Sequence, residues 1–160
     1  MRSLVIALAN ALNHNLAMNL PDNDREIVRN LKLNTGSKIS KIGSFLPIIT
    51  HQEKQDLEVR PYDIGKGNGE EDSFYSRARG EADDLILTAT SLINHSTVGI
   101  FEKLGTTTLP SMLTCPSIIA SPGLYEYLGI HYCAATVVTN VASILKDIRN
   151  GRGTAYLHRH

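Results

Sequence analysis

The sequence is poor in cysteine and in aromatic residues, which argues against two classes of protein. Two of its 160 residues are cysteine, none is tryptophan, and aromatic residues make up 6% of the chain. Small secreted domains usually depend on several disulfides, so Cys115 and Cys133 favour a reducing compartment and a cytoplasmic protein. Isolated cysteines within apolar sequence are typically buried small side chains, and we expect this of both. The scarcity of aromatic rings leaves little material for stacking nucleic-acid bases.

Net charge and long apolar runs are also absent. The chain has 16 lysine and arginine residues and 16 aspartate and glutamate residues, so its net charge is zero. A neutral chain lacks the basic surface that holds nucleic acid, and we expect no nucleic-acid partner. No apolar run approaches the ~20 residues that cross a bilayer, so we expect no membrane partner. The 42% hydrophobic and 20% charged residues are typical of a folded globular domain.

The first residues allow two interpretations. Met1 to Ala11 has one basic residue, a short apolar stretch and an Ala-x-Ala-like end, as a signal peptide does. Leu4, Leu8 and Leu12, however, recur at helical spacing. This spacing favours an amphipathic helix over residues 3–15, within a helical extension (1–37) that packs on the rest of the protein.

Short apolar segments alternate with helical patterns along the rest of the chain. We predict strands at 38–43, 57–62, 85–90, 109–114 and 130–138, with a closing edge strand at 154–157. Helices are predicted near 22–31, 48–55, 73–80, 91–104, 122–128 and from 140 onward, and a loop at 64–72. Such alternation predicts an α/β protein with a doubly wound, mostly parallel Rossmann-like sheet and helices on both faces. We expect one domain over residues 1–160.

Ligands of such sheets bind beyond the carboxyl ends of the strands, and the first two predicted strands end in candidate residues. Gly43, Ser44 and Phe45 follow the first strand, where glycine lets the backbone turn sharply and approach a ligand. One glycine stands where the dinucleotide fingerprint has three, so a tight turn is the competing interpretation. Asp63 ends the second strand, where a carboxylate can hold a ribose or form an Asx turn.

The later strand ends are richer in polar side chains. Residues 88–97 form the densest polar cluster, in which we expect Thr90 or Ser91 to cap the following helix. Asn94 is expected inside that helix, where asparagine is unfavourable unless its amide has a partner, so we predict a ligand role for it. Pro116 and Ser117 follow the fourth strand and complete the predicted site.

Metal-binding and catalytic patterns are weak in this sequence. His95 and Cys115 are candidate metal ligands, but no Cys-x-x-Cys or His-x-x-x-His pattern accompanies them. No catalytic triad can be read from the spacing. If proton transfer takes place, Asp63 or His95 would carry it.

One further pattern is the order of five segments: Leu4–Leu12, Lys41–Pro47, Asp84–Asn94, Cys115–Tyr125 and Val137–Asn140. In this order they resemble segments of the putative heavy-metal chelation domain family, which has no known biochemical function. The resemblance implies a Rossmann-like domain that usually follows a domain similar to the enolase N-terminal domain, with a ligand site in the cleft between the two. No counterpart of that first domain is seen in this sequence, so the chain is a fragment, a short homologue, or a subunit whose site a separate chain completes. Ala89, His95 and Cys115 stand where the family usually has glycine.

Three hypotheses of function follow. The first is a domain that binds a small polar ligand, in which a metal ion or a metal chelate serves as cofactor or cargo. The second is a nucleotide or S-adenosylmethionine-type site that uses Gly43 and Asp63. The third is a non-enzymatic subunit or interaction module, which forms a homodimer or pairs with a separate partner chain.

Overall fold

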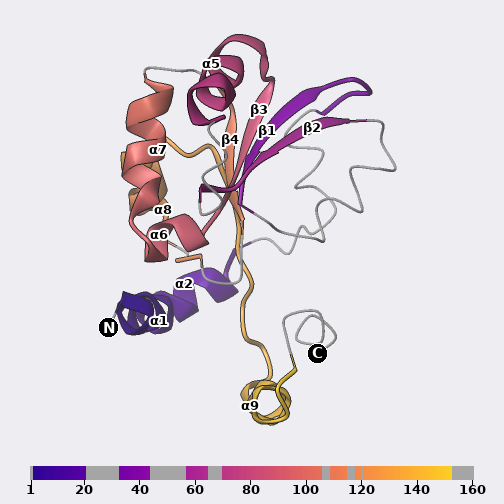
Figure 1. Cartoon of the computed structure of the whole chain (residues 1–160). Coiled ribbons are helices and arrows are strands. Elements are labelled where there is room, and N and C mark those ends of the chain that lie inside the picture. Colours follow the sequence, from indigo (N-terminus) through magenta and orange to yellow (C-terminus); the bar gives the residue numbers. More distant parts are fainter. Residues whose placement is uncertain are drawn as a thin grey trace.

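The computed structural model describes residues 2–20, 33–43, 57–64, 70–105, 109–114, 118–119 and 121–152. The helices predicted at 22–31 and 48–55 and the closing strand predicted at 154–157 lie outside these residues. Within the described part, the chain forms an α/β fold (Figure 1). No helix of this part is long and apolar enough to cross a membrane.

Five strands form one sheet, and every described pairing is parallel. The strands are β1 (Lys38–Ile42), β2 (Glu58–Tyr62), β3 (Asp84–Thr88), β4 (Ser111–Thr114) and β5 (Tyr132–Ala134). Their order is β2-β1-β3-β4-β5, so β2 is an edge strand of this sheet, where Pro61 is tolerated because proline has no N–H to donate. The Rossmann-like class predicted from the alternating pattern is therefore confirmed.

The described helices between strands lie on one face of the sheet. They are α5 (Glu71–Glu81), α6 (Thr90–Ile93), α7 (Ser96–Leu104) and α8 (Pro122–Leu128). Figure 1 shows α5, α7 and α8 together on the same side of the strands. The strand order explains this, because the connections from β2 to β5 all step across the sheet in one direction. Right-handed crossovers in one direction place every helix on the same face.

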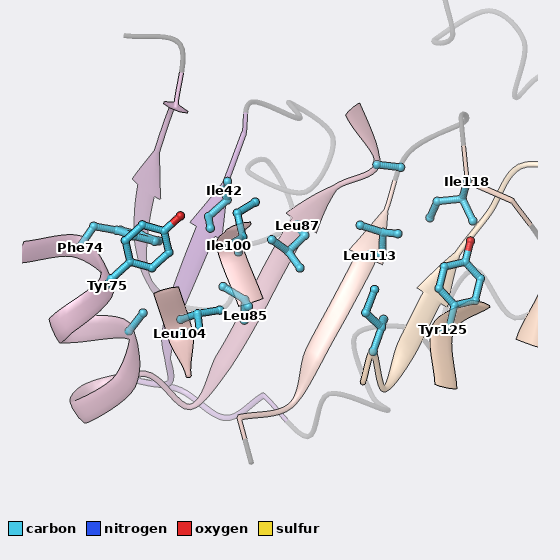
Figure 2. Close-up of a cluster of buried hydrophobic side chains, with 13 residues drawn as sticks. Ile42, Phe74, Tyr75, Leu85, Leu87, Ile100, Leu104, Leu113, Ile118 and Tyr125 are labelled. Carbon is cyan, nitrogen blue, oxygen red and sulfur yellow. The ribbon is translucent and has the colours of Figure 1, made fainter. Parts of the chain in front are cut away.

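The main core lies between this face and the helices (Figure 2). Strand residues Ile42, Leu85, Leu87 and Leu113 point to it, and each is at most 2% exposed. The helices contribute the buried side chains Phe74, Tyr75, Ala78, Ile100, Leu104 and Tyr125. Tyr62 at the end of β2 stacks on Phe74, with ring centroids 4.8 Å apart. This packing fixes the strands whose ends form the candidate site.

The opposite face of the sheet has a smaller core and two buried charged side chains. Ile39, Ile86 and Met112 form this core. Lys41 and Asp84 lie on the same face, because each is two residues from a core residue on its own strand. Asp84 is 3% exposed, and its Oδ1 has no hydrogen-bond partner. Burial therefore raises the pKa of Asp84 to about 6, and the neighbouring Asp83 contributes to the rise.

The helices at both ends of the described chain lie outside the layers formed by the sheet and by α5 to α8. The N-terminal pair comprises α1 (Arg2–Leu12) and α2 (His14–Met18), and α1 contacts α6. The last helix, α9 (Val141–Arg149), is capped by Asn140, whose Oδ1 accepts a hydrogen bond from Ser143 N–H at 3.0 Å. Gly129, which has φ +67°, follows α8 in the left-handed conformation that favours glycine.

Three local expectations are wrong. The helix predicted at 73–80 begins at Glu71, because the two acids assigned to a loop occupy its first turn, where carboxylates are favourable. The fifth strand spans Tyr132–Ala134 rather than 130–138, since its partner β4 is itself short. Cys133 is exposed rather than buried, because it lies on an edge strand. Cys115 lies outside the described residues.

Candidate functional site

The direction in which the chain connects neighbouring strands reverses between β1 and β3. From β1 the chain moves to β2 on one side, and it then crosses to β3 on the other side. In open parallel sheets, ligands bind beyond the carboxyl ends of the strands that flank this reversal. The residues there are Gly43 after β1, Asp63 after β2, and Thr88 to Thr90 at the end of β3. The candidate site is therefore this edge of the sheet.

At this edge, the backbone of Gly43 lies directly against Thr88. Gly43 has φ +90°, and a Cβ built on it would lie 2.2 Å from Thr88 Cγ2. Only glycine fits this approach without a shift of its neighbour. The N–H of Gly43 donates to the carbonyl oxygen of Tyr62 at 2.9 Å. The ends of three neighbouring strands thus meet around one glycine.

Two threonine hydroxyls lie beside this glycine. Thr88 Oγ1 is 3.2 Å from Thr90 Oγ1, and it accepts a long hydrogen bond from Thr90 N–H at 3.4 Å. Thr90 is exposed, so a ligand can reach this end of β3 from the solvent. Thr88 was not singled out as a site residue from sequence. The signal that could have found it is the run of hydroxyl residues at the end of an apolar strand.

Ser91 has a structural role rather than the predicted capping role. It is buried, and its Oγ accepts a hydrogen bond from Thr97 Oγ1 at 2.8 Å, which joins α6 to α7. The expected cap by Thr90 or Ser91 is wrong: Ala89 occupies the N-cap position of α6, and no side chain caps that helix. The reason is that α6 begins two residues after the end of β3, so that Thr90 is already its first residue.

Asn94 lies in a break between α6 and α7, although the sequence predicted one helix there. Its Oδ1 accepts hydrogen bonds from Ser96 N–H at 3.1 Å and Ser96 Oγ at 2.7 Å, at the start of α7. The argument for a ligand role from an amide inside a helix is therefore wrong, because the amide oxygen is engaged in local capping. His95 follows in the left-handed conformation, with φ 62°. It is the only non-glycine residue with positive φ in the described part of the chain.

Asp63 lies where the sequence placed it, next to the glycine turn. It is exposed and directly follows β2, whose last residue Tyr62 is bonded to Gly43. The structure therefore brings together Gly43, Asp63 and Thr90 of the predicted site, on three adjacent strand ends. Ser44, Phe45, Pro116 and Ser117 lie outside the described residues.

The described donors do not fit a bare heavy-metal ion. No group of three or more His, Cys, Asp or Glu side chains that could hold a metal occurs among the described residues. His95 is exposed, and the other candidate ligand, Cys115, is outside the described part. Threonine hydroxyls and an asparagine amide are poor ligands for transition metals. These residues suit a polar organic molecule better than a metal ion.

The sequence profile of the family described as putative heavy-metal chelation matches residues 26–160. The chain belongs to this family. The resemblance stated from the sequence is thereby confirmed, while heavy-metal chelation itself is only the family's description. No curated protein matches the chain.

Two solved structures from the same family share this fold. A protein of unknown function from Pyrococcus horikoshii has a TM-score of 0.67 and 17% sequence identity, over 92% of this chain and 61% of that one. A second protein of unknown function, from Desulfitobacterium hafniense, has a TM-score of 0.57 and 16% identity, over 80% of this chain and 56% of that one. The chain thus spans about three fifths of the length of these relatives.

His95 has a backbone conformation that is unfavourable for its side chain, because its φ of 62° lies in the left-handed region. Glycine adopts positive φ without steric cost, whereas histidine does so at a cost. This conformation therefore strains the break between α6 and α7, a few residues from the candidate site.

Proposed function

We propose that this chain is a binding domain for a small polar organic ligand at the carboxyl ends of β1 and β3. The observation that supports this most is the approach of Gly43 to Thr88 at the reversal of the strand order. A backbone held in a left-handed turn by a neighbouring strand is a preformed feature, because the hydrogen bond to Tyr62 and the contact with Thr88 fix its position. The hydroxyl of Thr90 adds a group that both donates and accepts hydrogen bonds.

The family's description fits this proposal best if the metal is carried by the ligand. Hydroxyl and amide groups recognise the oxygen atoms of an organic chelator well, and they bind transition-metal ions poorly. A chelate would supply the metal's own ligands, so the protein needs no cluster of cysteine and histidine. The expected cargo is therefore a polar organic molecule, with or without a metal bound to it.

The test is native mass spectrometry of the chain purified without chelator, with metal analysis of the same sample. We expect a bound small molecule in the wild-type chain. Thr90→Val replaces the hydroxyl with a methyl group, and it should weaken the affinity for the ligand about tenfold, the effect of one lost ligand hydrogen bond. Thr139→Val is the matched control, since Thr139 is exposed and lies near α9, away from the strand ends.

Calorimetric titrations distinguish a bare metal ion, a free chelator and a metal chelate as the ligand. The probes are Ni²⁺ alone, citrate alone and the Ni²⁺–citrate complex. Binding of Ni²⁺ alone with equal affinity in wild type and Thr90→Val would favour a bare-metal site elsewhere in the chain. A wild-type chain that is empty after gentle purification and that binds none of the three probes would overturn the proposal.

A nucleotide or S-adenosylmethionine-type ligand is the second candidate, and one observation favours it. The bond from Gly43 N–H to the carbonyl of Tyr62 places Asp63 beside the glycine turn, where a carboxylate can hold a ribose. Asp63→Ala should then abolish binding of ATP or S-adenosylmethionine in the same calorimetric assay. Unchanged binding would exclude a ribose contact by Asp63. We expect either ligand to be met in the cytoplasm, as the low cysteine content indicates.

A further inference from the structure

One face of α1 is apolar and uncovered. Three leucines one helical turn apart and a neighbouring valine form this face, here called the α1 stripe, and each is 59–77% exposed: Leu4, Val5, Leu8 and Leu12. The half-buried residues Ile6 and Ala9 lie on the other side of the helix, and α1 contacts α6. The leucine spacing predicted a helix that packs these side chains on its own domain. In the structure, the leucines point away from it.

The last helix also has an uncovered apolar face. Val141, Leu145 and Ile148 recur at helical spacing and are 47–61% exposed; they are here called the α9 stripe. Figure 1 shows α9 set apart from the sheet, at the end of an extended connection after β5. No extensive contact joins α9 to another helix or strand of the described part.

A helix this short should not persist in water by itself. It has nine residues, and isolated helices below about 12 residues are marginal even with a good cap. Most helical stability in proteins comes from packing of the apolar face. Asn140 caps the first turn of the helix, and the Asp147–Arg152 ion pair at 2.8 Å stabilises its last turn. Neither interaction covers the α9 stripe. The sequence of α9 therefore requires a partner surface.

We propose that the α1 stripe of one copy of this chain packs on the α9 stripe of a second copy, and that twofold symmetry repeats the contact. Both stripes belong to helices at the same end of the molecule, opposite α5 (Figure 1). In a twofold dimer every contact occurs twice, so each copy supplies both of the complementary stripes. One such contact covers four side chains of one copy and three of the other, so the two symmetric contacts together cover all seven in each copy. A helix at the end of an extended connection is typical of an element that two copies exchange in a domain-swapped dimer.

The area of this contact is that of a stable dimer. A leucine-sized side chain that is half to three-quarters exposed offers about 60 Å² of apolar surface. Seven of them in each of two copies bury about 850 Å² of apolar area. Apolar atoms make up about 60% of a typical interface, so the total is about 1,400 Å². Specific protein interfaces bury about 1,200–2,000 Å². The charges also permit the contact, since neither stripe contains a charged residue.

Sedimentation velocity of the full chain tests the proposal. We expect a species of twice the 17.5 kDa chain mass at about 10 μM. Leu145→Lys or Leu8→Lys should weaken the dimer at least about 100-fold, because each substitution places two charges in the apolar contact. The matched control is Ala142→Lys, which adds the same charge to α9 at an exposed position outside the stripe. It should leave the dimer intact.

Disulfide trapping tests which helices meet. In a background with Cys115 and Cys133 replaced by serine, Leu8→Cys chains are mixed with Leu145→Cys chains of a different tagged mass. A cross-linked pair of unequal chains is the expected product. A chain with both substitutions that cross-links only within itself would show that α9 folds back on its own α1, and it would overturn the proposal. The same conclusion follows if wild type is monomeric up to 100 μM, or if Leu145→Lys leaves the dimer intact. Binding of a monomeric chain to lipid vesicles would assign the stripes to a membrane surface instead.

Discussion

The contact between Gly43 and Thr88 makes a quantitative prediction about stability. Gly43→Ala places a methyl group 2.2 Å from Thr88 Cγ2, at a residue whose φ is +90°. The positive φ costs about 1–2 kcal/mol for a residue other than glycine. The overlap costs a further 1–3 kcal/mol or so, because Thr88 or the strand end must shift. We therefore expect the free energy of unfolding to fall by about 2–5 kcal/mol.

A second substitution separates the two costs. Thr88→Ser removes the Cγ2 methyl, so the overlap in the double variant is relieved. The nearest remaining atom is Cβ of residue 88, at 3.1 Å. Gly43→Ala with Thr88→Ser should therefore be more stable than the sum of the single effects predicts, by about 1–2 kcal/mol. The unfolding free energies come from urea denaturation followed by circular dichroism.

A matched control isolates the backbone cost. Gly36 has φ +84°, but a Cβ built on it meets nothing within 4 Å. Gly36→Ala should therefore cost only the about 1–2 kcal/mol of the positive φ, with no coupling to Thr88→Ser. The reasoning fails if Gly43→Ala costs no more than Gly36→Ala. It also fails if the cycle of Gly43 and Thr88 is additive to within about 0.5 kcal/mol.

Three further predictions concern single residues. Burial raises the pKa of Asp84 to about 6, above its usual 3.8, so the folded state holds the proton more tightly and stability falls as pH rises from about 4 to about 6. Asp84→Asn should remove up to about 3 kcal/mol of this loss in urea denaturations at several pH values. Asp83→Asn removes only the smaller contribution to the raised pKa, so it should remove much less of the loss. His95→Gly should raise the unfolding free energy by about 0.5–1.5 kcal/mol by relieving the left-handed backbone, and a loss of stability would contradict the strain. Asn140→Ala removes the cap of α9 and should lower helical circular dichroism and stability by about 1 kcal/mol, an effect that Asn140→Ser should largely avoid.

The sheet and most helix ends were predictable because their causes are local. The apolar run of β3 indicated a strand buried on both faces, and alternation with helical patterns indicated parallel pairing. The cap at Asn140 and the glycine after α8 also have local causes, since a cap depends on residues three or four positions away. Asn94 shows the limit of local reasoning. An asparagine can lie inside a helix or at the start of a new helix. Here the left-handed backbone at His95 separates α6 from α7, so that Asn94 lies in the break and its side chain bonds to the start of α7.

The sequence by itself determined that this chain forms an α/β domain, which segments become strands, and that polar groups gather at their carboxyl ends. Only the tertiary structure decided that β1 and β3 lie side by side, so that Gly43 meets Thr88. It also decided that the leucines of α1 point outward rather than into their own domain. The physical reason is the range of the interactions. Hydrogen bonds of caps and turns act over a few residues, whereas strand order and the burial of a helix face depend on packing between segments far apart in the chain.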